Sequence, residues 1–279
     1  MSGAAPQANS ISAKRLVLVG CGQMGSAMLR GWLASGAAAQ YLIVEPAGLP
    51  AAFSGNSAIT FCRTADGISG ESTPDAVVFA VKPQVIDDVL PAYRRWAQPQ
   101  TLFLSIAAGK TIAGLARHLG DAAIVRVMPN TPAAIGRAIS VACANPRVSP
   151  QQRRLSEALL TAIGESVWVE DEALMDPVTA VSGSGPAYVF LLIETLAAAG
   201  VKAGLPSELA LRLARDTVAG AGELARRSSE SPGKLRENVT SPGGTTRAAL
   251  DVLMAPDGMA QLLDEAIAAA TARSRELAS

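Results

Sequence analysis

A glycine-rich segment near the start of the chain has the spacing of a phosphate-binding loop. An apolar run over residues 16–19 ends in Gly20-Cys21-Gly22-Gln23-Met24-Gly25, and an amphipathic stretch follows and stops at Gly36. In dinucleotide-binding folds the first glycine permits a tight turn, the second admits the pyrophosphate, and the third lets helix and strand pack closely. The helix start then offers unpaired N–H groups to the phosphates. This order of strand, glycine loop and helix predicts a nucleotide site.

A carboxylate stands where it would meet the ribose of such a nucleotide. The next apolar run, YLIVE, ends at Glu45, which is 20 residues after Gly25. At this spacing an acidic group accepts a hydrogen bond from the ribose 2′-hydroxyl, and it would repel a 2′-phosphate. Residues 46–50 contain no basic residue, and the nearest one downstream is Arg63. We therefore expect NADH to work at least as well as NADPH.

The elements that must position these groups follow from further apolar runs over residues 58–62, 75–81, 101–106, 123–128 and 165–170. Nearly continuous apolar strands that alternate with helical segments are typical of a parallel sheet covered on both faces. Ligands lie beyond the carboxyl ends of such strands. The sequence there reads Ala80-Val81-Lys82-Pro83-Gln84, then Ala107-Ala108-Gly109, then Met128-Pro129-Asn130-Thr131-Pro132. Each is either a ligand-binding segment or an ordinary turn, and Lys82 either supports a cofactor or faces solvent.

The second half of the chain has a different texture, because strand signals vanish from about residue 171 onward. Ala/Leu-rich segments over residues 187–201, 207–227, 246–254 and 259–277 have a period near 3.6 and predict helices. No segment reaches ~18 uncharged apolar residues, so we expect packed helices of a soluble protein rather than membrane spans. Alanine-rich faces suit close packing, and we expect a homo-oligomer interface in this half.

Two glycine-rich segments interrupt these helices, and each precedes a helix start. The first is Ser182-Gly183-Ser184-Gly185-Pro186, and the second is Val239-Thr240-Ser241-Pro242-Gly243-Gly244-Thr245-Thr246. In the second, two glycines and two threonines at a helix start offer backbone donors, two hydroxyls and a favourable dipole to a carboxylate. The alternative is an ordinary capping segment.

Composition excludes several classes of function. The chain holds 24 basic and 24 acidic residues, so no overall field draws it to nucleic acid or to an anionic membrane. The halves differ in sign: residues 1–150 hold 12 basic and 7 acidic side chains, and residues 151–279 hold 12 and 17. Three widely spaced cysteines without a Cys-x-x-Cys pair predict neither a disulfide framework nor a zinc site and favour a reducing cytosol.

The single histidine, His118, leaves little room for a Ser/His/Asp triad or a two-histidine metal site, and we predict no metal. It lies at the end of a predicted helix over residues 111–119, where a basic group suits the helix dipole. Residues 1–13 are expected to form a loose extension that is neither a signal peptide nor a membrane span.

Taken in order, the motifs GCGQMG, AVKPQ, MPNTP, SGSGPAY and TSPGGTT resemble the pyrroline-5-carboxylate reductase family from about Leu16 to the C-terminus. The resemblance implies reduction of 1-pyrroline-5-carboxylate to L-proline by NADPH or NADH in the cytoplasm. It implies an α/β Rossmann-type dinucleotide-binding domain over residues 14–171, followed by an all-α dimerisation and substrate domain over residues 172–279. It also implies a homodimer and the assembly of dimers into rings.

The resemblance carries specific roles onto this chain. Residues 20–25 and 80–83 would hold the cofactor, with Ala108 near its nicotinamide end. Asn238 would lie between cofactor and substrate, and Glu172 would lie near the substrate. Gly243, Gly244 and Thr245 would receive the substrate carboxylate through backbone N–H groups, and Thr246 would hydrogen-bond the ring nitrogen. A threonine hydroxyl is too weak an acid to protonate an imine unaided, so Thr246 would orient the nitrogen and relay a proton from water or from a protonated iminium.

Two other functions compete with this one. β-Hydroxyacid dehydrogenases also join a Rossmann domain to a helical one, but they use a lysine of the helical domain as general acid/base. The helical half of this sequence contains only two lysines, Lys202 in the loop-like GVKAGLP and Lys234 beside Pro232-Gly233. Neither lies on a clear helix face. A non-catalytic nucleotide sensor would keep the glycine loop but would not need the Gly-Gly-Thr-Thr segment.

Overall fold

The computed structural model describes residues 13–68 and 73–278, and its contacts divide the chain into two compact units. The sheet unit comprises the chain up to Gly183 together with residues 271–279, and the helical unit comprises Ser184–Ala270. The boundary predicted between residues 171 and 172 lies earlier in the chain than this division. Residues 1–12 of the predicted extension lie outside the described residues, and Ala13 begins the first strand.

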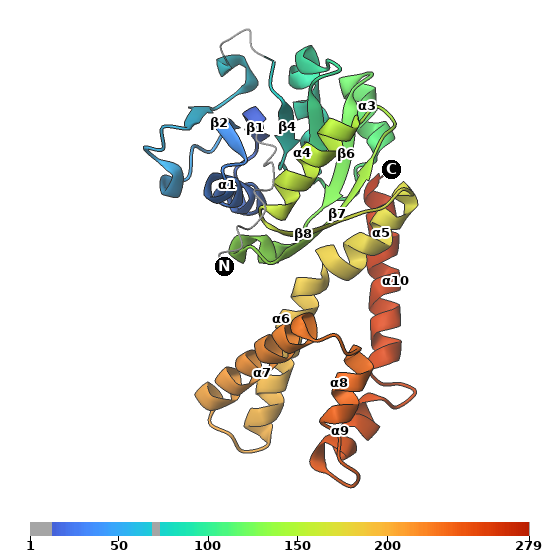
Figure 1. The fold of residues 1–279 in the computed structure, drawn as a ribbon. Helices are drawn as coiled ribbons and strands as arrows, with labels where there is room; N and C mark the ends of the chain where they lie inside the picture. Colours follow the sequence, from blue (N-terminus) through green and yellow to red (C-terminus); the bar gives the residue numbers. More distant parts are fainter. Residues whose placement is uncertain (1–12, 69–72, 279) are drawn as a thin grey trace, which may run out of the picture. The chain divides into compact units, whose positions relative to one another are not determined.

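The sheet unit is built on one eight-stranded sheet with the order β3-β2-β1-β4-β5-β6-β7-β8 (Figure 1). Each apolar run of the sequence forms a strand close to its predicted position. The strands are β1 Ala13–Val19, β2 Ala38–Val44, β3 Ile59–Cys62, β4 Ala76–Phe79, β5 Leu102–Ser105, β6 Ala123–Met128, β7 Ala138–Ala144 and β8 Gly164–Trp168. Because β2 and β4 flank β1 on its two sides, the strand order reverses there, which is where doubly wound sheets bind ligands.

Strand β7 corrects the prediction of a parallel sheet. It pairs antiparallel with β6 and parallel with β8. The turn that joins β6 to β7 contains the short 3-10 helix η4 Thr131–Ile135 and Gly136 at φ 68°, and only antiparallel neighbours can be joined by so short a connection. The strand reads AISVACA, whose small side chains carry little β signal. The sheet is therefore mixed.

Helices cover both faces of this sheet. Alternate residues of each central strand point to opposite faces, so Leu16 and Leu18 of β1 join one apolar cluster and Val17 and Val19 join another. The first cluster includes residues of α1 Gln23–Ser35 and α4 Pro150–Thr161. The second includes residues of α2 Ile86–Val89, the 3-10 helix η3 Leu90–Trp96 and α3 Ile112–Leu119. Further 3-10 turns are η1 Ala51–Phe53 and η2 Ala65–Gly67.

After β8 the described chain is helical to its end. It runs through η5 Glu172–Leu174, α5 Met175–Val178, the π-helix η6 Thr179–Gly183, α6 Gly185–Lys202, α7 Ser207–Arg227, α8 Pro232–Asn238, α9 Thr245–Leu253 and α10 Met259–Ala278. The four predicted helices are confirmed as α6, α7, α9 and α10. The segment Ser182–Pro186 precedes a helix start as predicted: the π-helix η6 ends at Gly183, Ser184 is the N-cap of α6, and α6 begins at Gly185. Two expectations are corrected: Lys202 closes α6 rather than lying in a loop, and Lys234 lies in the unpredicted α8.

The helical unit buries very little of its own surface. Among its described residues only Ala210 and Ala214 are buried. They lie where α7 packs on α6, and a Cβ on Gly200 of α6 would stand 3.3 Å from the Ala210 Cβ, so small residues let these two helices approach. The continuous helical run Glu172–Lys202 is also long and apolar enough to cross a membrane by length and composition.

Candidate active site

The glycine loop between β1 and α1 has the geometry that the sequence predicts. Gly20 has φ 91°, and a Cβ there would stand 2.7 Å from the carbonyl oxygen of Ala80. A Cβ on Gly25 would overlap the carbonyl oxygen of Gly20. Gly22 forms the N-cap of α1, and no atom of the described residues lies within 4 Å of a Cβ placed on it. Gly20 and Gly25 therefore serve the fold, whereas the space beside Gly22 can receive a phosphate.

Glu45 follows β2, and its half-buried carboxylate is held against the same loop. One oxygen accepts a hydrogen bond from the Cys21 N–H at 2.7 Å, and the other accepts from the Ala47 N–H at 3.0 Å. Two backbone donors fix the orientation of this carboxylate. The loop and the predicted ribose-binding acid are thus one connected structure.

A cavity of about 780 Å³ opens at the carboxyl ends of β1, β2 and β4. Of the predicted cofactor residues, it is lined by Gly20, Gly22, Glu45, Ala80, Val81 and Lys82. Its size suits a large part of a dinucleotide, and the open approach to Gly22 suits a pyrophosphate. The half-buried Pro83 and Ala108 follow β4 and β5 and do not line this cavity, and Met24 packs against the core of α1 and β1.

Cys21 contributes its backbone rather than its thiol. The side chain is buried, and burial raises the pKa of the thiol above its ordinary value. Its sulfur lies 3.6 Å from the Ser26 hydroxyl. Because a thiol must ionise to act as a nucleophile or metal ligand, thiol chemistry is disfavoured here. Within the described residues no group of three His, Cys, Asp or Glu side chains could hold a metal ion.

Two motifs far apart in the sequence meet beyond the end of β6. Asn130 of MPNTP donates through Nδ2 to the Ser182 hydroxyl at 3.4 Å and accepts from the Ile139 N–H at 3.1 Å. A Cβ on Gly183 would stand 3.0 Å from the sulfur of Met128, so this glycine allows a close approach. Ser182 and Gly183 belong to the π-helix η6, and π-helical turns occur frequently at functional sites.

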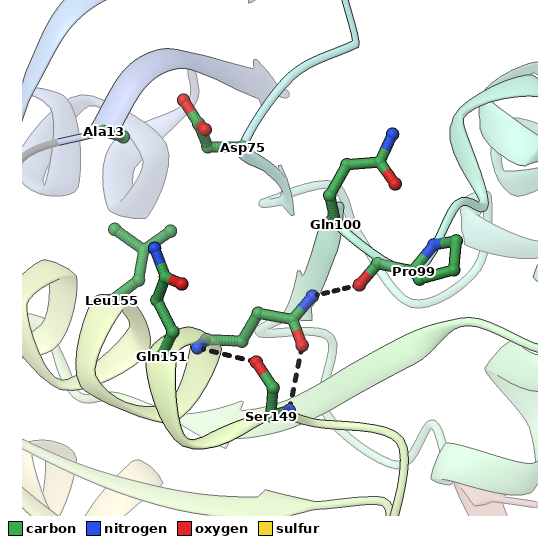
Figure 2. A pocket seen from close by; sticks show the side chains of 8 residues that line it. Ala13, Asp75, Pro99, Gln100, Ser149, Gln151 and Leu155 are labelled. Carbon is green, nitrogen blue, oxygen red and sulfur yellow. Dashed lines mark hydrogen bonds between the residues drawn. The ribbon is translucent and has the colours of Figure 1, made fainter.

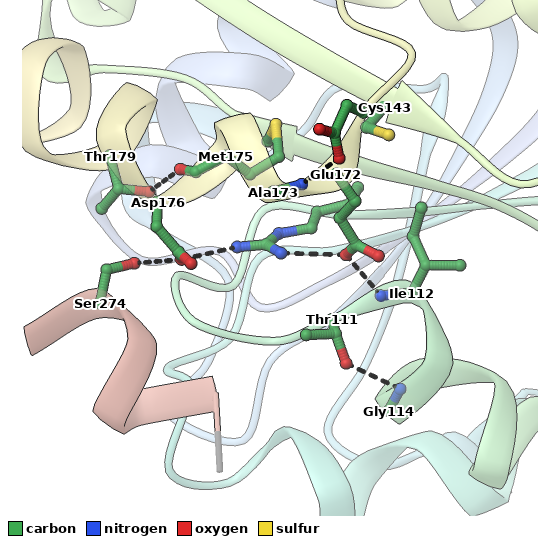
Figure 3. A network of polar contacts seen from close by, with 12 residues as sticks. Thr111, Ile112, Gly114, Cys143, Glu172, Ala173, Met175, Asp176, Thr179 and Ser274 are labelled. Atoms are coloured by element: carbon green, nitrogen blue, oxygen red, sulfur yellow. Dashed lines mark hydrogen bonds and ion pairs between the residues drawn. The ribbon is translucent and has the colours of Figure 1, made fainter. Parts of the chain in front are cut away.

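Glu172 lies in a network of charged groups around Arg126 (Figure 3). One carboxylate oxygen of Glu172 accepts from the Ile112 N–H at 2.8 Å and from Arg126 Nη1 at 2.9 Å. The Arg126 side chain is 3% exposed, and its Nη2 lies 3.6 Å from Asp176. Asp176 accepts from the Ser274 hydroxyl of α10 at 2.8 Å. Glu172 thus joins α3 to η5, and a contact between Glu172 and a substrate stays a prediction.

The sequence analysis did not single out Arg126, although one signal was present. It is the only charged residue in the apolar run AIVRVM of β6, and a charge in a buried strand requires partners. Neither Nε nor Nη2 has a hydrogen-bond acceptor among the described residues. The ion pairs with Glu172 and Asp176 therefore carry most of the compensation for burying this charge.

The remaining predicted substrate residues lie together in the helical unit. Gly243 has φ 69°, Gly244 is the N-cap of α9, and the helix begins at Thr245, as predicted. The Gly244 N–H donates to the Ser241 carbonyl at 3.1 Å, so the first-turn N–H groups that follow are the donors that an α-helix leaves without partners. Thr246 is half-buried. A small hollow of about 310 Å³ is lined by Thr240, Ser241, Pro242, Gly243 and Arg247.

Asn238 ends α8, five residues before this turn, and its amide donates to Glu230 at 2.9 Å. The predicted cofactor residues from Gly20 to Ala108 all belong to the sheet unit, and Asn238 and residues 243–246 belong to the helical unit. The structure therefore gathers six of the predicted cofactor residues around one cavity and places residues 243–246 at one helix start, whereas Asn238 contacts Glu230.

A second cavity, of about 410 Å³, lies at the opposite ends of the strands, and Figure 2 shows the side chains that line it. Its polar groups already have structural partners. Asp75 accepts from the Lys14 and Arg15 N–H groups at 2.7 and 2.9 Å. Gln152 forms a capping box with Ser149 at the start of α4. This second cavity lies near the amino ends of β1 and β5, whereas ligands of α/β sheets bind at the carboxyl ends of the strands. These polar groups hold strand and helix starts in place.

Comparison with known proteins agrees with both halves of the chain. Residues 172–277 match the family described as pyrroline-5-carboxylate reductase dimerisation, and residues 15–109 match the family described as NADP oxidoreductase coenzyme F420-dependent. The chain is 41% identical to pyrroline-5-carboxylate reductase of Pseudomonas aeruginosa over 96% of this chain and 98% of that protein. It is 40% identical to the enzyme of Pisum sativum, covering 94% and 95%.

Solved structures extend this likeness to the fold. The crystal structure of Plasmodium falciparum pyrroline carboxylate reductase with NADP bound matches with a TM-score of 0.82 at 30% identity, covering 97% of this chain and 100% of that one. The enzyme of Coxiella burnetii matches with a TM-score of 0.86 at 32% identity, covering 95% and 98%. The cavity at the glycine loop and the glycine-threonine helix start thus occur in a chain that belongs to the pyrroline-5-carboxylate reductase family.

Proposed function

We propose that this chain reduces 1-pyrroline-5-carboxylate to L-proline, with the cofactor bound at the glycine-loop cavity and the substrate bound at the start of α9. The observation that carries the proposal is that one chain holds both a dinucleotide cavity at the switch point of its sheet and a Gly-Gly-Thr-Thr helix start. The first provides for a hydride donor, and the second provides for a substrate that carries both a carboxylate and a ring nitrogen. A non-catalytic nucleotide sensor needs only the first.

The cofactor belongs to the proposed dinucleotide-binding domain, residues 14–171. NAD(P)H supplies the hydride when it is bound. Residues 20–25 would receive the pyrophosphate at the start of α1, Glu45 would hold the ribose, and residues 80–83 and Ala108 would follow the cofactor toward its nicotinamide end. The geometry of this loop supports these roles. Gly20 and Gly25 are crowded by neighbouring atoms, whereas the space beside Gly22 is open to a pyrophosphate.

The substrate belongs to the proposed helical domain, residues 172–279. Its carboxylate would accept hydrogen bonds from the backbone at residues 243–245, where the positive end of the α9 dipole adds to the attraction. Because the Gly244 N–H already donates to Ser241, this donor would be shared with the substrate or released to it. Asn238 would lie between cofactor and substrate.

Thr246 has the role that requires a side chain. Reduction adds a hydride to the imine carbon and one proton to the nitrogen. The Thr246 hydroxyl would orient the ring nitrogen and pass on a proton from water, since a threonine hydroxyl is itself a poor acid. Where the nitrogen is already protonated as an iminium, hydride addition needs no further proton and the hydroxyl would only accept a hydrogen bond from the N–H. Positioning of this kind can supply much of a rate enhancement without any strong acid, and the single histidine of the chain is not needed.

The active form is proposed to be at least a homodimer, and dimers would assemble further into rings. The support is the exposed apolar surface of the helical unit, which includes Phe190, Leu191, Leu192, Leu262 and Leu263, together with the match to a dimerisation family. Such patches on soluble proteins mark interaction sites. The three cysteines are free thiols, which supports a cytoplasmic location.

Kinetics of two neighbouring variants test the proposal. We expect Thr246→Ala to lower kcat/KM for 1-pyrroline-5-carboxylate at least tenfold, about 1.4 kcal/mol of transition-state stabilisation, with nucleotide affinity retained. Thr245→Ala is the matched control, because Thr245 acts through its backbone, and we expect less than a threefold loss. The readout is loss of NADH or NADPH absorbance on adding the substrate. Wild-type kinetics for Thr246→Ala would overturn its role, and activity only with a 3-hydroxy acid and NAD would favour a β-hydroxyacid dehydrogenase.

A further inference from the structure

Both carboxylate oxygens of Glu45 are held by hydrogen bonds within the protein itself. Its two oxygens accept from the Cys21 and Ala47 N–H groups, and its backbone carbonyl accepts from the Gly48 N–H at 3.1 Å in a tight turn in which Gly48 has φ 106°. Rotation of this carboxylate away from the cavity would leave the part-buried Cys21 N–H without its acceptor, which is costly. The negative charge therefore stays at the mouth of the cavity.

Arg63 is a basic residue that contacts the chain directly after this carboxylate. It follows β3, whose last residue Cys62 pairs with Val44 of β2. Its Nη1 donates to the carbonyl oxygen of Pro46 at 2.7 Å. Its side chain is exposed, whereas Glu45 is half-buried, so solvent screens the arginine more than the carboxylate. Arg63 therefore braces the loop after Glu45.

The other charges around the cavity add to the negative side. The described residues that line it include three carboxylates, Glu45, Asp66 and Asp88, and two cations, Arg63 and Lys82. Lys82 follows β4, which is separated from β2 by β1. Since neighbouring strands lie ~4.8 Å apart, the ends of β2 and β4 stand about 10 Å from each other. Lys82 is thus poorly placed to neutralise a phosphate beside Glu45.

From this arrangement we infer that the fixed carboxylate of Glu45 makes this chain select NADH over NADPH, and that Arg63 holds the Glu45 loop instead of binding a 2′-phosphate. The inference rests on the proposed function for the place of the cofactor. The two nucleotides differ only in a 2′-phosphate, and a phosphate monoester carries about −1.5 to −2 charges at pH 7. A 2′-hydroxyl can donate to Glu45, whereas a 2′-phosphate is mostly a dianion, which has no proton to donate and is repelled.

The test compares both cofactors in the full-length wild-type protein and three variants. We expect wild-type kcat/KM for NADH to exceed that for NADPH at least tenfold. Glu45→Gln keeps the size of the side chain and removes its charge, and we expect it to lower this ratio at least tenfold. Glu165→Gln removes one charge from an exposed position on β8, at the far edge of the sheet, and we expect no change in the ratio. Arg63→Ala should weaken both cofactors by the same factor.

Several outcomes would overturn the inference. These are a wild-type ratio near one or in favour of NADPH, an equal effect of Glu45→Gln on both cofactors, or a loss in Arg63→Ala confined to NADPH. Direct titration of NADH and NADPH without substrate, followed by nucleotide fluorescence, separates this inference from the proposed function. Selective NADH binding without reduction of 1-pyrroline-5-carboxylate would refute the function alone, and reduction with both cofactors equally would refute the selectivity alone.

Discussion

The two units of this chain bury apolar side chains in opposite ways. The sheet unit encloses Trp32, Phe79 and Phe103 completely, and helices cover both faces of its sheet. The helical unit has two buried residues, both alanine, among those that the structure describes, while Phe190 is 57% exposed. Both units are rich in apolar residues, so composition alone does not separate them. What differs is whether the apolar surface finds a partner within the same chain.

This difference teaches where the stability of each unit comes from. Burial of a large apolar side chain stabilises a fold by about 1.5–3 kcal/mol, and the sheet unit has many such side chains. The helical unit buries no large apolar side chain among its described residues. Its helices α6 and α7 pack through small side chains, and such a helix pair has little stability of its own. A second copy of the same unit would supply the missing contacts. The glycine-loop cavity thus lies in the unit with its own core, and the proposed substrate loop lies in the unit whose apolar side chains stay exposed within one chain.

The largest expected effect comes from a charge placed on the exposed face of the helical unit. We expect Phe190→Asp to raise the dissociation constant of the proposed dimer at least 1,000-fold, about 4.1 kcal/mol, because it removes apolar burial and buries a charge. A twofold-symmetric interface would carry the change twice. Sedimentation would show a smaller mass, with activity lost in parallel.

Val167→Asp is the matched control, since Val167 is an exposed apolar residue on β8 of the sheet unit. Its mass and activity should stay close to those of the wild type. An unchanged mass for Phe190→Asp, or an equal loss for both variants, would show that the exposed face of α6 is not an interface. In that case the contrast between the two units would need another explanation.

The ease of prediction differed from element to element. Strands β4, β5 and β6 follow directly from short, nearly continuous apolar runs, and α7 follows from a 3.6-residue period over Ser207–Arg227. Strand β7 was missed because AISVACA has small side chains. The π-helix η6 was not predicted because its Ser182-Gly183 pair is typical of a loop, and only the surrounding contacts, such as Asn130 on Ser182, favour the helical form.

The candidate site divides in the same way. The glycine loop could be predicted because the spacing of its glycines reflects local backbone conformation and packing. Glu45 could be predicted from its position 20 residues after Gly25. The network around Arg126 could not be assembled from the sequence, because Arg126 and Glu172 are 46 residues apart and Asp176 and Ser274 are 98 apart. Such pairs depend on how α5 and α10 return to the sheet, which local patterns do not encode.

A second prediction concerns the network that ties α5 and the end of α10 to the sheet unit. We expect Arg126→Met to lower the free energy of unfolding of the sheet unit by about 3 kcal/mol, because two partly buried carboxylates lose their partner. Denaturant titration followed by tryptophan fluorescence measures it directly, since Trp32, Trp96 and Trp168 all lie in this unit.

The control for this variant is Arg147→Met, because Arg147 pairs with Asp121 at 2.6 Å and both side chains are more than half exposed. Exposed pairs contribute about 0–1 kcal/mol, so its unfolding midpoint should move little. If both variants lose the same stability, the burial of Arg126 contributes nothing beyond an ordinary surface pair, and Glu172 would be free for the role near the substrate that the family resemblance implies.

The smallest expected effect separates structure from ligand binding within one loop of the sheet unit. A methyl group at Gly22 would meet no described atom, whereas one at Gly25 would overlap the Gly20 carbonyl oxygen. We expect Gly22→Ala to change the free energy of unfolding by less than about 0.5 kcal/mol and to weaken nucleotide binding about tenfold, or 1.4 kcal/mol. We expect Gly25→Ala to lose stability first. If Gly22→Ala keeps full nucleotide affinity, the space beside it does not receive the pyrophosphate. The cofactor would then have to lie elsewhere at the carboxyl end of the sheet.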